Sequence, residues 1–458
     1  MKGFWYTYSN IFKLVEEELG ITDAFTPYTK SGFWSPTKGL VTESPVFSEL
    51  PRLPTLLGQF VHTVDLFRGV PLPDRASMLP LFPALLEYKA TPETYKRYDQ
   101  MTFRELCRQC GVSNTLYEEF MKPLLLVGLF APPEELSAGV VLEMLYYYAL
   151  AHQNDFDVKW ARGSVSETIF QPLMAQMREQ GCEILGGHPM TGLEMDGGRV
   201  KSVSAYDIDG KREVSFEADH VVLCMGVTGM QKLVQGCAEL GRRREFRNVM
   251  HLRGIDVMSV RVWFDKKGST QFPSNVLSGF EPNVGGTFFN LNELHDEYKD
   301  CEGSVIAADF YHAGSLLPLS DEAVAHKVAE FVRTCEPSFE GAKVTDFAVL
   351  RFPKAVTHFT PGSYPFRPLQ TTSIHNLFVA GDWVKGLPHG SQALCQERAY
   401  VAGLRAANLV IQDSGVGREA EILDVEPDEP HIAAGKYAAR LLREGADTLG
   451  IRSPFLFP

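Results

Sequence analysis

The sequence lacks long apolar runs and an excess of basic residues. No stretch of about 18 uncharged apolar residues occurs, which is the length that a membrane-spanning helix needs. The apolar stretch 137–151 contains Glu143 and is too short to cross a bilayer. The 44 Lys and Arg residues are outnumbered by 57 Asp and Glu, giving a net charge of -13. This balance gives no overall excess of positive charge that could bind the phosphates of a nucleic acid, so we expect no nucleic-acid partner.

Cysteines are few and scattered. Eight of them in 458 residues are typical of a reducing compartment and not of a disulfide framework. Cys107 and Cys110 form a CxxC pair, but no second pair completes a zinc site, and Gly111 after them is typical of a helix end. We therefore predict a structural role for this pair and no metal site.

The N-terminus lacks recognisable targeting features. Residues 1–6 contain neither the apolar core of a signal peptide nor the Ser- and Arg-rich character of a transit peptide. From its first residues the sequence has the pattern of a folded domain. Any targeting sequence is therefore expected outside this chain.

The sequence is that of a globular protein, with 45% hydrophobic and 22% charged residues. Its length favours two or three domains. Helical spacing of apolar residues dominates from about residue 60 to 180, with candidate helices at 78–88, 102–110, 114–126, 137–152 and 165–180. Strand patterns with hairpin turns follow, as a meander of strands at 183–186, 190–194 and 200–207, and a further helix is predicted at about 321–335. These patterns divide the chain into an N-terminal region, 1–60, a helical subdomain, 61–160, a mixed part, 161–235, a sheet, 236–360, a C-terminal part, 361–412, and a peripheral tail, 413–458.

The stretch that organises the chain lies near its end. An apolar run from Leu377 stops at Gly381 and Asp382, and a helix-like segment extends from about Gly390 to Ile411. This pattern predicts a strand, a tight turn and a helix whose small residues lie close to a sheet. A helix N-terminus directed at the turn suits an anionic group such as a pyrophosphate or a reduced flavin. An ordinary α/β unit without a ligand fits the same spacing.

Three segments in order along the chain are WARGS (160–164) followed by GCEI (181–184), ADHVVLC (218–224), and PGS, RPLQ and NLFVAGDW within 361–383. They resemble the carotenoid desaturases, including phytoene and zeta-carotene desaturase, within the flavin-containing amine oxidase superfamily, and the resemblance extends to about residue 412. It implies an α/β fold with a Rossmann-like FAD-binding domain of the glutathione reductase type, truncated at its N-terminus, an α+β substrate domain and a helical subdomain. In these terms, 61–160 is the helical substrate-binding subdomain, 161–235 and 361–412 are the FAD-binding parts, and 236–360 is the substrate-domain sheet.

The same resemblance implies FAD as the cofactor and assigns residues to it. Asp382 would bind near the ribityl and pyrophosphate segment, and Gly381 would allow close backbone approach. The N-terminus of the following helix would face the N1/C2 carbonyl of the flavin, where hydride transfer leaves negative charge. Met190 aligns with a residue whose main chain contacts adenine, which in the family is normally Val. The predicted cofactor-binding set is Met190, Gly381, Asp382, Trp383, Ser391, Gln392, Ala393 and Arg162. No catalytic residue is assigned.

Several of these residues have a second interpretation. Asp382 could cap the next turn, and Arg162 could be a solvated charge or a ligand of the cofactor phosphates. His389 could be a loop residue or a base, although hydride loss to a flavin needs no strong base beside the ring. Lys354 is similar to the lysine that many amine oxidases hold near flavin N5, but its context does not decide its role. The aromatic run 146–148 fits helix packing or the wall of an apolar tunnel.

The expected glycine-rich motif is missing. Proteins of this fold begin with a strand and a G-x-G-x-x-G turn that holds the FAD pyrophosphate, and no such motif occurs in the first hundred residues. In the family, sequence similar to residues 1–5 follows that unit. Met1 is therefore interpreted as an internal methionine of a truncated gene model, or as the start of a shortened protein. An in-frame glycine-rich unit upstream of Met1 would favour the first interpretation.

The leading hypothesis is an FAD-dependent oxidoreductase that dehydrogenates or isomerises a long apolar polyene by hydride transfer to the flavin. The alternatives are a non-catalytic protein that binds an apolar ligand or a membrane surface, and an amine oxidase. The expected partners are an apolar small-molecule substrate, a membrane contacted peripherally, and quinone or oxygen as electron acceptor. The expected location is a plastid or the membrane-associated cytoplasm.

Overall fold

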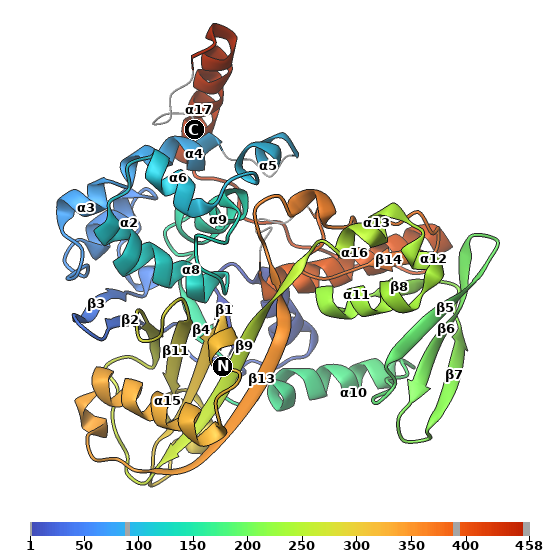
Figure 1. Cartoon of the computed structure of the whole chain (residues 1–458), viewed down its shortest axis with the longest axis horizontal. Coiled ribbons are helices and arrows are strands. Elements are labelled where there is room, and N and C mark those ends of the chain that lie inside the picture. Colours follow the sequence, from blue (N-terminus) through green and yellow to red (C-terminus); the bar gives the residue numbers. More distant parts are fainter. Residues whose placement is uncertain (1, 88–91, 388–393, 452–458) are drawn as a thin grey trace.

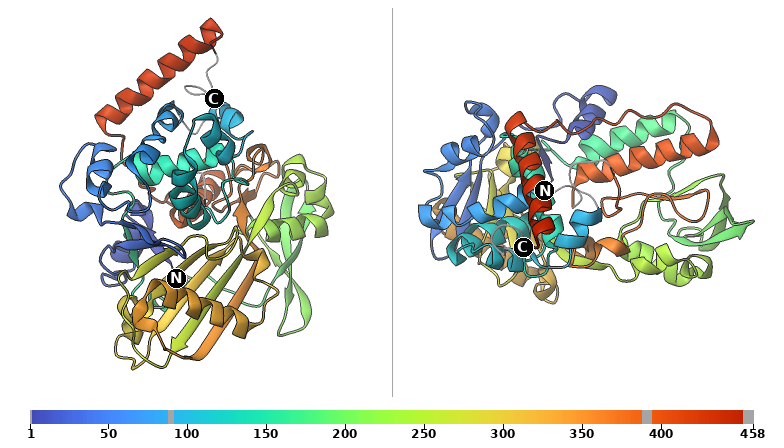
Figure 2. Two further views of the ribbon diagram at one scale, coloured as in Figure 1. Left: turned by 60° about the vertical axis from the view of Figure 1, so that its left-hand side comes forward. Right: turned by 90° about the horizontal axis from the view of Figure 1, so that it is seen from above.

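The fold is described by a computed structural model that covers residues 2–87, 92–387 and 394–451. Figure 1 shows three neighbouring regions: a large sheet at the bottom, a helical subdomain above it, and a smaller α/β unit to the side. A C-terminal helix projects from the helical subdomain. The two further views in Figure 2 show that this helix lies on the outside of the molecule.

The large sheet has seven strands in the order β13-β9-β12-β11-β10-β2-β3. Its pairings are antiparallel except for the parallel pair β10 and β2. Residues of the predicted N-terminal region thus complete the sheet predicted for 236–360. The strands are β2 (Ser31–Ser35), β3 (Gly39–Ser44), β9 (Arg253–Phe264), β10 (Ser274–Leu277), β11 (Gly285–Asn290), β12 (Val305–Tyr311) and β13 (Val344–His358).

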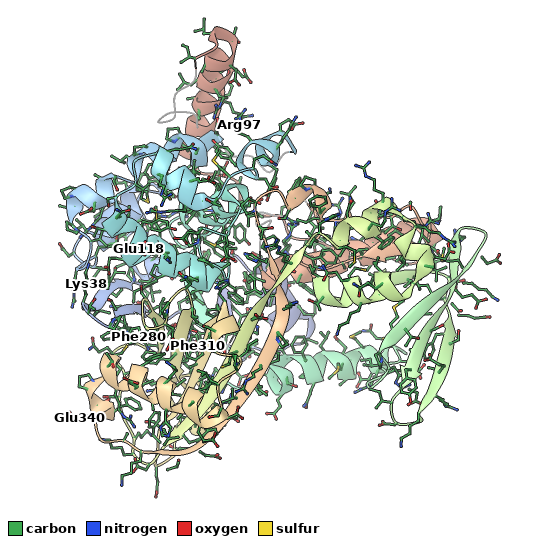
Figure 3. The ribbon with its side chains drawn as sticks, in the orientation of Figure 1. Lys38, Arg97, Glu118, Phe280, Phe310 and Glu340 are labelled. Atoms are coloured by element: carbon green, nitrogen blue, oxygen red, sulfur yellow. The ribbon has the colours of Figure 1, made fainter. Side chains whose placement is uncertain are left out.

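Helix α15 (Asp321–Cys335) covers one face of this sheet, as its sequence predicts. Ser320 caps it by accepting a hydrogen bond from the Ala323 amide at 3.2 Å. Its apolar positions recur at helical spacing and are buried against the sheet. Phe331 of this helix packs edge-on against Phe280 and Phe310, both labelled in Figure 3.

The helical subdomain contains the predicted helices and, in addition, the short helices α2 (Leu57–Thr63), α3 (Leu72–Ala76) and α5 (Pro92–Tyr98). Its core is a cluster of buried aromatic and aliphatic side chains that also includes residues of the N-terminal helix α1 (Ser9–Phe12). Helix α8 contacts β10 and β11 on the sheet face opposite α15, so the subdomain closes that face. Its other helices include α4 (Phe82–Glu87), α6 (Phe103–Gln109), α7 (Asn114–Leu116), α8 (Lys122–Gly128) and α9 (Ala138–Leu145).

The smaller α/β unit is built around two parallel strands, β8 (Val221–Leu223) and β14 (Leu377–Val379). Helices α11 (Val227–Gly236), α12 (Ala238–Gly241), α13 (Arg244–Val249) and α16 (Gln396–Ser414) belong to the same unit. Two strands of the predicted meander are confirmed as β5 (Met190–Asp196) and β6 (Arg199–Asp207), and β7 (Arg212–Glu217), which was not predicted, completes the sheet. The strand predicted at 183–186 is wrong: no strand forms there, and Leu185 is 43% exposed. Its apolar run is short and follows the end of helix α10 (Gln171–Glu179) directly.

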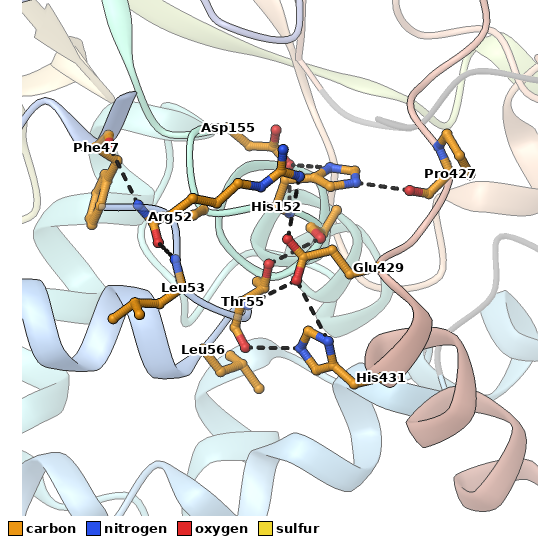
Figure 4. Close-up of polar contacts among 12 residues, drawn as sticks. Phe47, Arg52, Leu53, Thr55, Leu56, His152, Asp155, Pro427, Glu429 and His431 are labelled. Atoms are coloured by element: carbon orange, nitrogen blue, oxygen red, sulfur yellow. Dashed lines mark hydrogen bonds and ion pairs between the residues drawn. The ribbon is translucent and has the colours of Figure 1, made fainter. Parts of the chain in front are cut away.

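The segment that follows α16 connects distant parts of the chain before it enters α17 (Pro430–Leu449). Asn10 on α1 exchanges two hydrogen bonds with the backbone of Leu423. Figure 4 shows the next contacts, where the His152 ring bonds the Pro427 carbonyl at 2.9 Å and Glu429 accepts from the Thr55 amide at 3.0 Å. The segment predicted as a peripheral tail is therefore attached to buried groups. Across the described ranges, no helix combines the length and apolarity needed to cross a bilayer.

His152 is expected to make this attachment sensitive to pH. Its hydrogen bond to Asp155 raises the pKa of His152 from 6.5 to about 9, although burial opposes the shift. Because the pKa is higher in the folded protein, the charged ring stabilises the fold fully at pH values below the unfolded pKa of 6.5. This stabilisation is lost as the pH rises through 9. We expect wild type to exceed His152→Gln by about 2 kcal/mol in free energy of unfolding at about pH 6.

This difference should shrink by about pH 10, where the ring is neutral in both states. Urea unfolding of both proteins across this pH range measures it. A difference independent of pH would show that His152 acts through packing alone.

Candidate functional site

The candidate site lies where the chain leaves β14. Residues Leu377, Phe378 and Val379 are buried and pair in parallel with β8. The Ala380 amide then donates to the Leu223 carbonyl at 2.9 Å, which is the last sheet bond before the turn. Loops at the carboxyl ends of parallel strands are the usual ligand-binding positions of such sheets. The predicted strand and turn are thus confirmed at this position.

Gly381 is required here for two local reasons. Its φ of +140° lies in a region that other residues rarely adopt, and an added Cβ would lie 2.9 Å from the Trp383 ring. That indole is 1% exposed and donates through Nε1 to the Met225 carbonyl at 3.2 Å. The sequence predicted that a bulky residue at 381 would meet the cofactor. The structure shows that it would first meet Trp383.

Substituting Gly381 by Ala should destabilise the protein by about 1 to 3 kcal/mol, because the backbone is strained and the indole must move. Gly403→Ala on α16 is the matched control, since an added Cβ there has no neighbour within 4 Å. Alanine at that helical position should be neutral or stabilising by about 0.5 to 1 kcal/mol. Thermal and urea unfolding of both variants test this, and equal stability of the two would contradict it.

The Asp382 side chain is half-buried, and no side chain in the described part of the loop region donates a hydrogen bond to its carboxylate. Burial raises its pKa to about 6, even though Arg398 and Arg367 favour the charged form. The backbone amides of Asp382 and Trp383 also favour the carboxylate, but among the described residues no side chain donates a hydrogen bond to it. If Asp382 only capped the next turn, its carboxylate would not need to be removed from water in this way. An ionised group held in this way is typical of a ligand contact.

Two buried arginines fix the loop around Asp382. Arg367, 1% exposed, donates to the Trp383 carbonyl at 2.7 Å and the Val384 carbonyl at 3.0 Å. Arg398, fully buried, donates to the Asp382 carbonyl at 2.9 Å and the Val384 carbonyl at 2.6 Å. Burial, followed by repulsion from Arg367, lowers the pKa of Arg398 to about 10. Carbonyl oxygens can only accept hydrogen bonds, so the two planar guanidinium groups act as donors that hold the carbonyls of residues 382–384 in one arrangement.

Neither arginine was predicted from the sequence to hold the loop. A signal for Arg398 was present, since it occupies the same helical stripe as Val401, Ala402 and Ala406, which are all buried. A charged residue on an apolar stripe requires a buried partner. Arg367 lies in an irregular segment without periodicity, so no comparable signal marked it.

The helix after the loop begins later than predicted. Ser391, Gln392, Ala393 and His389 lie outside the described residues. Cys395 precedes α16, which starts at Gln396, so the predicted entry at Ser391 is not the N-terminus of α16. Of the small residues predicted to lie close to the sheet, Ala402 and Ala406 are buried in the core around β8 and β14, whereas Ala399 and Gly403 are exposed.

The first turn of α16 makes a separate contact. The Glu397 carboxylate is fully buried and accepts from the amides of Asn10 and Ile11 at 2.8 and 3.0 Å. It therefore joins the helix to α1 instead of facing the turn.

The remaining predicted cofactor residues fall in two places. Met190 is the first residue of β5, pairs with Ala205, and packs against the same core as Trp383. Arg162 forms a two-bond ion pair with Asp296 at 3.0 and 3.2 Å and lines a cavity of about 350 Å³ with Lys299. The structure thus brings Met190 to the core beneath the loop, whereas Arg162 is engaged elsewhere.

Three other sequence candidates also have definite positions. Lys354 is exposed at a bulge in β13, with a φ of +50° and its amide bonded to Asp256. Cys107 and Cys110 are buried free thiols, and no group of three or more His, Cys, Asp or Glu in the described part is arranged to hold a metal. Residues 146–150 form a helical turn, η5, with Tyr147 and Tyr148 buried in the subdomain core.

Comparisons with known proteins agree with this architecture. A family model described as flavin containing amine oxidoreductase matches residues 2–411. A 15-cis-phytoene desaturase of Synechococcus elongatus is 24% identical over 310 residues, which are 67% of this chain and 64% of the relative. A probable zeta-carotene desaturase of the same organism is 23% identical over 354 residues, covering 74% and 72%. The chain therefore spans about two thirds of the length of these relatives.

Solved structures show the same fold at low identity. Cyclohexylamine oxidase from Brevibacterium oxydans superposes with a TM-score of 0.62 and 13% identity, over 90% of this chain and 87% of that one. A putative protoporphyrinogen oxidase from Exiguobacterium gives 0.59 and 15%, over 91% and 87%. The predicted α/β fold class is confirmed, and the chain belongs to the family of flavin-containing amine oxidoreductases.

Proposed function

We propose that this protein is an FAD-dependent oxidoreductase of the carotenoid desaturase type, acting on a long apolar polyene. The observation that carries the cofactor assignment is the Asp382 carboxylate, which burial disfavours in its charged form and which receives no side-chain hydrogen bond from the described residues, in a loop held by two buried arginines. Removing a carboxylate from water is unfavourable unless donors replace the water, and ligand hydroxyls would add to the backbone amides of Asp382 and Trp383. Hydroxyl groups of the ribityl chain or ribose are donors of the required kind, so these residues fit FAD.

Each residue of the loop has a defined task in this proposal. Asp382 accepts hydrogen bonds from the cofactor hydroxyls, and Gly381 keeps the backbone free of a side chain at the turn. Arg367 and Arg398 fix the loop carbonyls, so that the acceptor is positioned before the ligand arrives. When bound, the flavin supplies hydride acceptance, which the side chains of the protein cannot provide.

The cofactor proposal is tested by purifying the protein from the complete open reading frame that contains this chain. A flavin absorbance band that co-purifies with the protein and is released as FAD on denaturation is the expected result. A folded protein, verified by circular dichroism, that takes up no FAD would refute the proposal. That outcome would favour the alternative of a non-catalytic apolar-ligand protein.

The substrate class is supported by the desaturase relatives. It is tested by anaerobic mixing of the flavin-loaded protein with cis-carotenes in detergent micelles or with simple amines. Bleaching of the flavin by carotenes alone is expected. Bleaching by amines alone would make the protein an amine oxidase. Reoxidation by a quinone or by oxygen then identifies the electron acceptor.

We also propose that the protein contacts a membrane peripherally, because a polyene partitions into lipid. Helices α2 and α3 carry exposed apolar side chains, and Arg75 connects them by donating to the carbonyls of Val64 and Phe67 at 2.6 Å. Co-sedimentation with lipid vesicles should decrease in Leu72→Glu, and unchanged sedimentation would contradict the assignment. The apolar residues are Leu57, Phe60, Val61 and Leu72, which are 45 to 54% exposed.

A further inference from the structure

Helix α17 has two apolar faces, and the described residues cover only one of them. The inner face carries Ile432, Ala439 and Ala446, seven residues apart and all buried. It packs on α4, where Gly435 lies against Leu86. Arg443 secures this contact by bonding the Glu87 carboxylate at 2.8 and 2.7 Å. The helix is thus rigidly placed on the body through one side.

The outer face remains exposed and apolar. At about 100° per residue, an arc of about 140° from Tyr437 to Leu442 includes no Asp, Glu, Lys or Arg of the helix. Figures 1 and 2 show α17 projecting from the molecule, so this face is open to approach. The exposed apolar residues on it and just beyond the helix are Tyr437, Leu441, Leu442, Leu449 and Ile451, which are 50 to 74% exposed.

Charges at the border of this face are ordered along the helix. Arg440 and Glu444 flank the same edge, with the basic residue nearer the N-terminus. If a second α17 lies antiparallel, the same edge of each helix meets, and Arg440 of each copy faces Glu444 of the other. A parallel pair would instead place this charged edge against the uncharged edge at Leu442. The charge order therefore favours a second copy in antiparallel orientation.

The shape of the outer face is also self-complementary about Leu441. Tyr437 and Gly445 lie four residues on either side of it, and a Cβ on Gly445 would have no neighbour within 4 Å. In a two-fold antiparallel pair, the Tyr437 ring of one copy fills the open position at Gly445 of the other, twice by symmetry. Leu441 and Leu442 then pack at the centre.

We propose that the outer face of α17 is a homodimer interface, formed by antiparallel pairing with α17 of a second copy. The interface is a single helix from each copy and is smaller than the area of a typical stable complex. The dimer is therefore expected to be weak and dependent on protein concentration. The proposal is independent of the reaction that the protein catalyses.

The first test is sedimentation velocity of the full chain over a range of concentrations. We expect a reversible monomer–dimer equilibrium, and Leu441→Glu should raise its Kd by at least about tenfold, because each dimer contains the buried charge twice. Leu72→Glu on α3, also at a half-exposed leucine, is the matched control and should leave Kd unchanged. A monomer at all concentrations, or a dimer that Leu441→Glu leaves intact, would overturn the proposal.

A charge exchange tests the orientation. Arg440→Glu and Glu444→Arg should each weaken the dimer by about three- to tenfold through like charges at the edge. The double variant should recover most of that loss. Failure of the double variant to recover would overturn the antiparallel arrangement. Vesicle binding by a monomer that is lost in Leu441→Glu would instead make a lipid surface the occupant of this face.

Discussion

Replacing Asp382 by Asn is expected to reduce the affinity for FAD by about 10- to 100-fold, because a charged acceptor of ligand hydroxyls is lost. The same substitution should not weaken the fold. Burial raises the pKa of Asp382 from 3.8 to about 6. Above that pH the ionised carboxylate therefore lowers the free energy of unfolding of the FAD-free protein. At about pH 8, the Asn variant without FAD should be more stable than wild type by on the order of 2 kcal/mol.

The pH dependence separates this expectation from a general effect of the substitution. Below the unfolded pKa of 3.8 both proteins carry an uncharged side chain at 382, so their stabilities should agree. The difference should develop as pH rises from about 4 to 6. FAD titration and urea unfolding are the two measurements, and Asp196→Asn at an exposed position of β5 is the control. A variant that binds FAD normally would remove Asp382 from the proposed site.

Replacing Arg398 by Met is expected to destabilise the protein by about 3 to 5 kcal/mol and to abolish FAD binding. The substitution leaves the carbonyls of Asp382 and Val384 without these donors, and it removes a counter-charge to Asp382 and Glu143. Arg398→Lys should recover only part of the loss, because an ammonium group cannot reproduce the planar fork to two carbonyls.

Arg405→Met on the same helix is the control, since this position is half-buried and away from the loop. Thermal unfolding and FAD titration of the three variants distinguish the outcomes. If Arg398→Met unfolds like wild type, the guanidinium does not hold the loop. If it is destabilised yet binds FAD normally, the shape of the loop is not what the cofactor requires.

Sequence reasoning located the elements with strong local signals. The helix at Asp321–Cys335 has a capping serine and a regular apolar stripe, and the meander after Met190 has a glycine turn, so both were predictable from neighbours along the chain. The short run at 183–186 had the composition of a strand but no partner, and pairing is a tertiary property. The start of α16 was misplaced because small residues continue the helical pattern upstream of Gln396.

By itself, the sequence determined the fold class and the turn at Gly381 and Asp382, because strand, turn and family resemblance are written in consecutive residues. The surroundings of that turn depend on tertiary contacts. The Trp383 indole bonds the Met225 carbonyl, and the guanidinium groups of Arg367 and Arg398 bond the loop carbonyls from other segments. A contact with Asp296, far along the chain, holds Arg162 at a different place. Desolvation of Asp382 likewise depends on packing from several segments, and no local pattern encodes it.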